Sequence, residues 1–240
     1  MIIDLVQQIR WTHKKMGGKK LYKLLEKDIH RIDAGMGRDK FFDLLRKWKF
    51  LVVRYRKYAV TTQSYHRFRV YKNQLTGFTP VQPHQAWVCD ITYIRIKKGF
   101  VYLFLITDAF SRKIVGWELS NSLGLEGALK SLRMAINQCP RTEGLIHHSD
   151  RGFQYCSHEY VTLLRAKGVT ISMAEAGNCY ENATAERVNG ILKGEYGLDE
   201  NYSNEQEARK AAHEGIQAYN NQRPHWSLNL QIPSKVHAAA

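Results

Sequence analysis

The sequence predicts an α/β protein in which a mixed sheet with helices on both faces follows a small, basic, helical domain. Apolar residues recur at helical spacing in the first part of the chain, whereas three β-rich runs begin near Gln85 and lead into alternating helical and strand patterns. The charge is divided in the same way: residues 1–80 hold 19 Lys and Arg against 6 Asp and Glu, and the remaining residues hold 17 against 16. A polyanion-binding front joined to a near-neutral body is therefore expected.

The composition is that of a soluble globular protein. Apolar residues make up 44% of the 240 residues, and the mean hydropathy is −0.44. The longest apolar runs, such as 101–106, fall far short of the ~20 residues that a membrane helix needs. The four cysteines form no C-x-x-C pair, and the start of the chain has no signal-peptide pattern. We therefore expect a reduced, cytoplasmic protein without a structural zinc or a membrane partner.

Residues 1–55 are expected to form a helix-turn-helix-like DNA-binding domain. Two apolar repeats at helical spacing flank a glycine-containing turn at residues 33–37. Any small helical hairpin shares this pattern, so the surrounding basic residues favour the DNA-binding interpretation. The residues expected to contact phosphates are Lys19, Lys20, Lys23, Arg38, Lys40, Arg46 and Lys47.

Residues 56–84 are expected to be a basic, aromatic linker. Tyrosine and phenylalanine alternate with arginine and lysine from residue 54 to residue 72, and Pro80 and Pro83 follow. This interleaving suits a segment that lies along a nucleic-acid backbone, and it suits equally a linker with some strand character.

The third region, residues 85–200, is expected to form the core, which a C-terminal helix and tail at 201–240 complete. Strands are expected at 87–96, 100–107, 113–119, 144–148 and 169–173, and helices at 125–137, 157–167, 182–196 and 204–220. Short joins between the first three strands indicate an antiparallel meander, and the later helices indicate crossovers to parallel strands.

Three acids stand where this order of elements brings them together. Asp90 lies inside the first apolar strand, where an acid is costly unless it is paired or metal-bound. Asp150 ends the fourth strand, and ligands bind at the carboxyl ends of strands in open α/β sheets. Glu186 lies a few residues into a helix. Three carboxylates suit a pair of Mg²⁺ ions about 4 Å apart, which take oxygen ligands and serve in-line displacement at phosphorus.

Each acid has an ordinary structural interpretation when it is taken alone. An aspartate in a strand is often a turn or ladder feature, and an exposed glutamate on a helix is common. Asp108 illustrates this, because it also follows an apolar run and yet is expected only to cap the turn at residues 109–112. The order, spacing and sequence context of the three acids therefore support the site, and no single acid does.

Five motifs occur in order, with 35 residues between Asp150 and Glu186. They are Trp87-Val-Cys-Asp-Ile-Thr-Tyr93, Thr107-Asp-Ala-Phe-Ser-Arg-Lys-Ile-Val-Gly-Trp117, His148-Ser-Asp-Arg-Gly-Phe-Gln-Tyr155, Gly177-Asn-Cys-Tyr-Glu-Asn-Ala-Thr-Ala-Glu186 and Tyr219-Asn-Asn-Gln-Arg-Pro-His225. Together they resemble the integrase core of retroviral-type recombinases, and most closely the second-reading-frame product of bacterial insertion-sequence transposases of the IS-three family. The likeness covers about residues 15–235, and its small departures, at 180–182 and 226–233, leave the acids untouched.

The resemblance implies a ribonuclease H-like fold with a five-stranded mixed sheet and a metal-binding catalytic triad of Asp90, Asp150 and Glu186. It implies two Mg²⁺ ions, for which Mn²⁺ substitutes. The implied reaction is DDE-type polynucleotidyl transfer, in which a strand is cleaved at the transposon end and its 3′-hydroxyl is transferred into target DNA.

Supporting roles near the acids also follow from the resemblance. Lys193 lies two helical turns beyond Glu186 on the same face and is expected to contact transposon-end DNA, although an exposed helix lysine is the ordinary alternative. DNA or aspartate contacts are expected of His148 and Arg151, and a role in shaping the loop and helix start before Glu186 is expected of Asn178 and Asn182.

The implied partners are DNA, as transposon ends and target, and a second copy of the chain. Relatives of this kind gain an upstream domain by frameshift fusion, and the chain is expected to start after that point, so the upstream product is a further expected partner. The expected location is the bacterial cytoplasm, in association with the nucleoid. Two alternatives stay open, namely a DNA-binding regulator without catalysis and a ribonuclease H-like nuclease without strand transfer.

Overall fold

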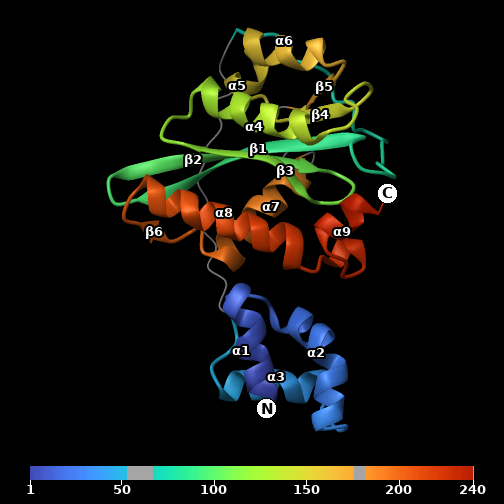
Figure 1. The fold of residues 1–240 in the computed structure, drawn as a ribbon, viewed down its shortest axis with the longest axis vertical. Helices are drawn as coiled ribbons and strands as arrows, with labels where there is room; N and C mark the ends of the chain where they lie inside the picture. The colour runs from blue at the N-terminus through green and yellow to red at the C-terminus, as the bar shows by residue number, and fades with distance from the viewer. Residues whose placement is uncertain (53–66, 176–181, 240) are drawn as a thin grey trace. The chain divides into compact units, whose positions relative to one another are not determined.

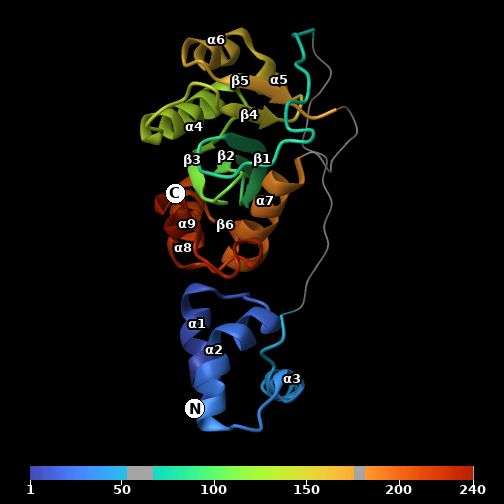
Figure 2. The same ribbon diagram turned by 90° about the vertical axis from the view of Figure 1, so that its right-hand side faces the viewer.

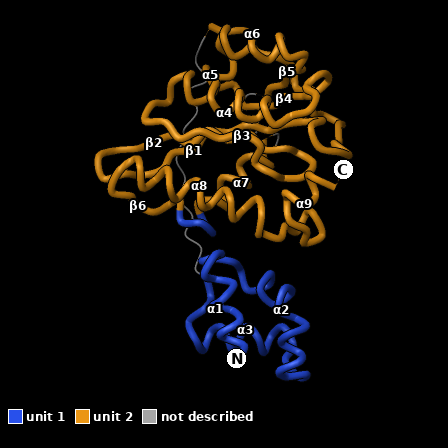
Figure 3. The backbone as a smooth tube through the Cα atoms, viewed as in Figure 1, with its two compact units in different colours: residues 1–58, 194–197 blue, residues 59–193, 198–240 orange. Residues whose placement is uncertain are grey.

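The computed structural model describes residues 1–52, 67–175 and 182–239. The chain divides into two compact units, coloured separately in Figure 3. Unit 1 comprises residues 1–58 with 194–197, and unit 2 comprises residues 59–193 with 198–240. No helix of the described residues is long and apolar enough to cross a membrane.

The described part of unit 1 is a small helical bundle. It contains α1 (Ile2–Thr12), α2 (Gly18–Ile32) and α3 (Arg38–Lys47). Leu21, Leu25 and Ile29 recur every four residues on α2 and are almost completely buried with Phe41 and Leu45 of α3. The turn between these helices is the one predicted from the sequence, and the Gly35 amide donates to Asp33 Oδ1 at 2.9 Å. The apolar spacing predicts two helices in this region, and the structure shows a further helix before them, α1.

Unit 2 is built on a mixed sheet. Its strands are β1 (Ala86–Ile96), β2 (Gly99–Asp108), β3 (Ile114–Ser120), β4 (Ile146–Ser149) and β5 (Thr170–Met173), with a short β6 (Asn201–Tyr202) paired to the end of β1. Their order across the sheet is β3-β2-β1-β4-β5. The first three strands are antiparallel, and β1, β4 and β5 are parallel. This is the predicted meander followed by crossovers.

Helices cover both faces of this sheet (Figures 1 and 2). One face carries α4 (Leu125–Gln138), α5 (Phe153–Cys156) and α6 (His158–Ala166), and the other carries α7 (Ala183–Tyr196), α8 (Glu205–Gln222) and α9 (Pro233–Ala238). A single 3-10 turn, η2 (Trp226–Leu228), lies between the last two helices. The predicted fold class is confirmed, and α5, β6 and α9 are short elements that periodicity alone does not reveal.

The central strand β1 is buried on both faces, which explains its nearly continuous apolar sequence. Trp87 and Cys89 enter the large core cluster that includes residues of α4, α5 and α6. Ala86 and Val88 point the opposite way and pack with Ala185 of α7. Because side chains alternate along a strand, Asp90 shares the face of Ala86 and Val88, toward α7.

The backbones of β3 and α4 approach closely at Gly116. A Cβ atom at this position would lie 2.3 Å from the carbonyl oxygen of Ser131 and 2.9 Å from Cβ of Ala135. Only glycine fits there, and this close approach seats α4 on the sheet.

Gly116→Ala is therefore expected to lower the free energy of unfolding by about 1–3 kcal/mol, because the added methyl forces β3 and α4 apart. The matched control is Gly190→Ala in α7, where the new methyl meets nothing within 4 Å. That change is expected to leave stability unchanged or to raise it, because alanine is the better helix former. Chemical denaturation followed by circular dichroism compares the two, and equal midpoints would contradict the packing argument.

Candidate active site

The register of β1 against β4 places Asp90 beside Asp150. The two parallel strands pair from Ala86 with Ile146 to Val88 with His148. Two residues beyond the last pair come Asp90, which is still in β1, and Asp150, which directly follows β4, so the register brings the two acids next to each other. This juxtaposition follows from the backbone pairing, not from any attraction between the side chains.

Asp90 carries the clearest electrostatic signature of the site. Its pKa is raised to about 7, first by burial, then by the negative charge of Asp150, with a smaller contribution from Glu186. Two hydrogen bonds act in the opposite direction: Asn189 Nδ2 donates to Asp90 Oδ2 at 2.7 Å, and the Ile91 amide donates to Asp90 Oδ1 at 2.9 Å. Asp150 and Glu186 therefore both lie close enough to Asp90 to act on its carboxylate.

Asp150 follows β4 in a tight turn. The Gly152 amide donates to Asp150 Oδ1 at 2.9 Å, which fixes this carboxylate oxygen in the turn. Arg151, which lies between Asp150 and Gly152 in the chain, is partly buried. Its Nε donates to the carbonyl oxygen of Ala174 at 2.9 Å.

Helix α7 carries Glu186, which is exposed. Asn182, just before the helix, is buried and donates from Nδ2 to the carbonyl oxygen of Cys89 at 3.0 Å. Asn189 lies one turn beyond Glu186 and makes the bond to Asp90 described above. Two asparagines thus attach α7 to neighbouring residues of β1, Asn182 to Cys89 and Asn189 to Asp90, and this attachment sets where Glu186 stands. Asn178 lies outside the described residues.

Lys193 stands on the same side of α7, and its ammonium group lies 4.0 Å from the centroid of the Tyr93 ring. Burial lowers the pKa of Lys193, and the charge of Asp90 opposes that effect. This lysine is therefore partly buried beside the acids, held by a cation–π contact, and is more than an exposed helix residue.

The turn between β2 and β3 braces the start of α7. Arg112 adopts a φ of 63°, a costly conformation for a residue with a side chain, and donates from Nη1 to Thr184 Oγ1 at 3.3 Å. Tyr219 Oη of α8 donates to the carbonyl oxygen of Arg112 at 3.0 Å. Asn220 accepts from the Ile114 amide and donates to the Ile114 carbonyl, both at 2.9 Å.

Asp108 is completely buried at the start of this turn. Its Oδ1 accepts from the amide and hydroxyl of Ser111, each at 2.8 Å, and its Oδ2 accepts from the His84 amide at 2.8 Å. Asp108 therefore caps the turn, and its carboxylate is already fully engaged in holding backbone.

Sequence reasoning named Asn182 but missed Asn189 and Asn220 as residues that organise the site. A signal was present for Asn189, because a polar residue three positions after Glu186 falls on the same helix face. Asn220 lies in a quoted motif, but the strand that it contacts is about a hundred residues earlier in the chain, so spacing alone does not reveal its role.

Two residues expected to contact DNA are buried. His148 is 0% exposed, and its Nδ1 shares a hydrogen bond of 2.8 Å with Ser172 Oγ. Lys20 is 5% exposed. Neither side chain is exposed for a direct phosphate contact in this conformation, so the DNA contact stays a prediction for both residues, and for His148 the predicted contact with the aspartate is the alternative.

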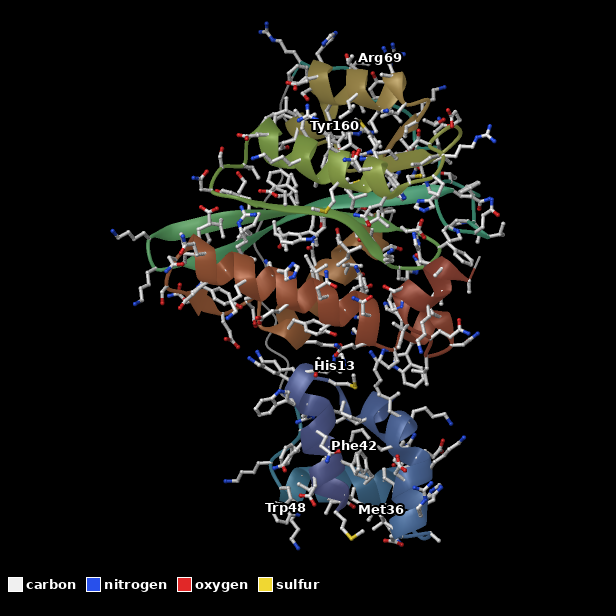
Figure 4. All side chains as sticks on the ribbon, in the orientation of Figure 1. His13, Met36, Phe42, Trp48, Arg69 and Tyr160 are labelled. Carbon is white, nitrogen blue, oxygen red and sulfur yellow. The ribbon has the colours of Figure 1, made fainter. Side chains whose placement is uncertain are left out.

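The other basic residues expected to contact phosphates in unit 1 are exposed, namely Lys19, Lys23, Arg38, Lys40, Arg46 and Lys47. Three of them pair with an acid on their own helix, in the pairs Lys23–Glu26, Arg38–Asp39 and Arg46–Asp43. Such exposed pairs are weak and exchange readily for a phosphate contact. Figure 4 shows many of the unit 1 side chains projecting away from the helices.

The donor set at Asp90 and Asp150 fits a hard divalent cation. Carboxylate oxygens are the preferred ligands of such ions, and the repulsion that raises the pKa of Asp90 is what a cation would remove. The buried Oδ1 atom of Asn189 has no hydrogen-bond partner among the described residues and adds a further oxygen near the acids. Outside residues 53–66, 176–181 and 240, no three His, Cys, Asp or Glu side chains are already gathered at metal-binding distances.

Comparison with known families gives one consistent result. Models of the integrase core domain match residues 80–179 and 167–233. The uncharacterized 31 kDa protein of insertion element IS600 from Shigella sonnei is 37% identical over 201 residues, which cover 83% of this chain and 74% of that protein. The transposase for insertion sequence element IS629 from Shigella sonnei is 37% identical over 146 residues, 61% of this chain and 49% of that protein.

The transposase InsF for insertion sequence IS3A from Escherichia coli (strain K12) is 36% identical over 139 residues, covering 58% of this chain and 48% of that protein. The chain therefore spans about half the length of these two transposases and about three quarters of the IS600 protein.

Solved structures with the same fold are retroviral integrases. The HTLV-2 integrase catalytic core domain, solved in complex with magnesium, has a TM-score of 0.53 at 17% identity and covers 66% of this chain and 99% of that one. A simian T-cell lymphotropic virus intasome in complex with a PP2A regulatory subunit has a TM-score of 0.57 at 18% identity, with 92% of this chain and 70% of that one covered. At these identities the likeness shows the fold, which is the ribonuclease H-like fold implied by the sequence motifs.

The raised pKa of Asp90 predicts a pH dependence of stability in the metal-free protein. The pKa of Asp90 is 3.8 in the unfolded chain and about 7 in the native protein. Between these two pH values the native state keeps a proton on Asp90 that the unfolded state has released, so the free energy of unfolding falls as pH rises through this window. Asp90→Asn removes this titration. In EDTA, the melting temperature of the variant should rise relative to wild type as pH increases from 4 to 8, and a constant difference would contradict the assignment.

A second variant tests the hydrogen bond to Asp90. Asn189→Leu removes a donor that lowers the pKa of Asp90, so the window over which stability falls should extend to higher pH. In the double variant with Asp90→Asn, this extension should disappear, because no carboxylate remains to titrate. Melting curves in EDTA at a series of pH values measure both effects.

Proposed function

Because the chain belongs to the IS-three family of insertion-sequence transposases, we propose that it cleaves DNA at transposon ends and transfers the resulting 3′-hydroxyl into target DNA. The observation that carries this proposal is the placement of Asp90 and Asp150 side by side, with Glu186 on a helix attached to the same strand by Asn182 and Asn189. The reaction is a DDE-type phosphoryl transfer, in which the protein positions the reactants and forms no covalent bond with DNA.

Asp90, Asp150 and Glu186 would hold Mg²⁺, as two ions, with Mn²⁺ as a substitute. When bound, these ions would supply Lewis-acid stabilisation of the phosphoryl oxygens during in-line displacement. The protein's own contribution is orientation: Gly152 and Asn189 each hold one carboxylate oxygen in place. Asn189 also opposes the burial that would otherwise keep Asp90 protonated near neutral pH.

Cations near the acids would hold the DNA strand. Lys193 is fixed against Tyr93 within electrostatic reach of Asp90, which suits a contact to the strand next to the scissile bond. Arg151 is partly exposed beside Asp150 and suits the same role. The exposed cations of unit 1 suit contacts to the phosphate backbone that do not depend on sequence.

The expected partners are transposon-end and target DNA, a second copy of the chain, and the upstream-frame product by fusion or association. Joining two ends of an element calls for at least two active sites, which motivates the homo-oligomer. Association with the bacterial nucleoid follows from the DNA substrate.

Asp150→Asn and Glu186→Gln are each expected to abolish Mg²⁺-dependent nicking and strand transfer, with a fall of at least about a thousandfold, while DNA affinity stays near wild type. Asparagine keeps an oxygen that can accept from the Gly152 amide, so the turn is preserved. The matched control is Glu214→Gln, an exposed glutamate on α8, which should leave activity unchanged. Gel assays with an oligonucleotide that carries the element's end measure cleavage and joining.

Three results would decide against the proposal. Full activity of Asp150→Asn would remove the triad assignment. Nicking without joining would favour a nuclease, and binding without nicking, even after fusion to the upstream-frame product, would favour a regulator. The basic front of the chain fits a regulator equally well, but a pure binder has no need for three acids beside a polyanion.

A further inference from the structure

Two arginines far apart in the sequence converge on one tyrosine at the edge of unit 2. The guanidinium carbon of Arg69 lies 5.3 Å from the centroid of the Tyr71 ring, and that of Arg165, at the end of α6, lies 5.8 Å from it. Arg165 Nη2 also donates to Tyr71 Oη at 3.2 Å. Figure 4 labels Arg69 beside α6. We name Arg69, Tyr71 and Arg165 the arginine clamp.

The clamp is built on an anchored segment. Tyr71 packs against the large core cluster on one side of the sheet, and Leu75 packs against the small cluster on the other side. Between them, the Gln74 amide donates to Ser172 Oγ of β5 at 2.8 Å. Residues 71–75 therefore pass over the edge strand β5 and cover it, which holds Tyr71 in a defined place.

The charges of the clamp are not neutralised within the part of the chain that the structure describes. Neither Arg69 nor Arg165 lies within ion-pair distance of a carboxylate there, and both are exposed. Nearby exposed arginines behave differently, since Arg133 lies 3.9 Å from Glu159 and Arg141 lies 3.5 Å from Glu143. Two cations held on one ring repel each other, and an anion that contacts their guanidinium groups offsets that repulsion.

The chemistry of the clamp selects a phosphodiester. A guanidinium presents a planar fork of donors that matches phosphate oxygens, and stacking on an aromatic ring orients that fork before binding. The Tyr71 ring is already occupied by two guanidinium groups and by the core, so it orients arginines and is not free to stack on a base.

The clamp and the acids lie at opposite ends of the parallel strands. Helix α6 ends at Ala166, just before β5 begins at Thr170, whereas Asp150 follows the end of β4, which is parallel to β5. A four-residue strand spans roughly 13 Å. DNA bound at the clamp is therefore held away from the scissile phosphate.

We propose that the arginine clamp binds a backbone phosphate of duplex DNA outside the region where the strand is cut. This inference rests on the proposed function in that it takes DNA as the substrate, but it assigns a contact that the triad does not need. Its role is to hold the flank of the duplex, so it contributes affinity and no chemistry.

The test measures binding of the full chain to a fluorescent duplex of random sequence over a series of salt concentrations, in EDTA. Arg69→Gln and Arg165→Gln should each weaken binding and lower the slope of log affinity against log salt by about 1. Tyr71→Leu should weaken binding because both guanidinium groups lose their cation–π contact with the Tyr71 ring, and Arg165 also loses its hydrogen bond to the Tyr71 hydroxyl. Arg133→Gln, an exposed arginine with its own acidic partner, is the matched control and should keep the wild-type slope.

A wild-type slope in both arginine variants would overturn the clamp, and so would weaker binding with an unchanged slope, because that result indicates a structural role. Loss of affinity for inorganic phosphate alone, without loss for the duplex, would also overturn it. The control variant Arg133→Gln should also retain Mg²⁺-dependent nicking at the wild-type rate. The proposed function fails by a different result, the absence of nicking in the wild-type chain, so the two failures are distinguishable.

Discussion

The parallel pairing of β1 with β4 is the constraint on which the candidate site depends. It brings Asp90 and Asp150 next to each other, where burial and mutual repulsion disfavour two charges. Hydrogen bonds from Asn189 and the Ile91 amide to the Asp90 carboxylate partly offset that repulsion. Such a pair is poised for an external positive charge, which is the chemical basis of the proposed metal-dependent reaction.

The third acid depends on a longer chain of contacts. Helix α7 is attached to β1 through Asn182, and its first turn is braced by Arg112 through Thr184. Arg112 adopts its unfavourable backbone conformation in a turn that Asp108 caps from one end and α8 supports from the other. Helix α8 thus contributes to the geometry of a site to which it supplies no acid. This contribution gives a physical role to the motif that begins with Tyr219 and Asn220.

Charge is distributed so that the two tasks of the proposed function, holding DNA and cutting DNA, would fall to different parts of the chain. Residues 81–240, which contain the acids, hold 17 Lys and Arg against 16 Asp and Glu, and most of the excess positive charge belongs to the first 80 residues. Within unit 2, cations are placed individually: Lys193 is held by Tyr93 beside the acids, and the arginine clamp lies at the far end of the parallel strands. In both places an aromatic ring fixes a cation without neutralising it, so the charge stays available to phosphate.

The sequence by itself determined the order of the longer strands and helices of the sheet domain and the turn before α3, and it predicted the three acids, because these features depend on local periodicity and on motifs that are contiguous in the chain. Only the tertiary structure decided that His148 and Lys20 are buried, that Asn189 bonds to Asp90, and that Arg69 and Arg165 share Tyr71. The physical reason is that burial and hydrogen bonding depend on partners up to about a hundred residues away. Spacing along one element does not encode which distant surface will cover it.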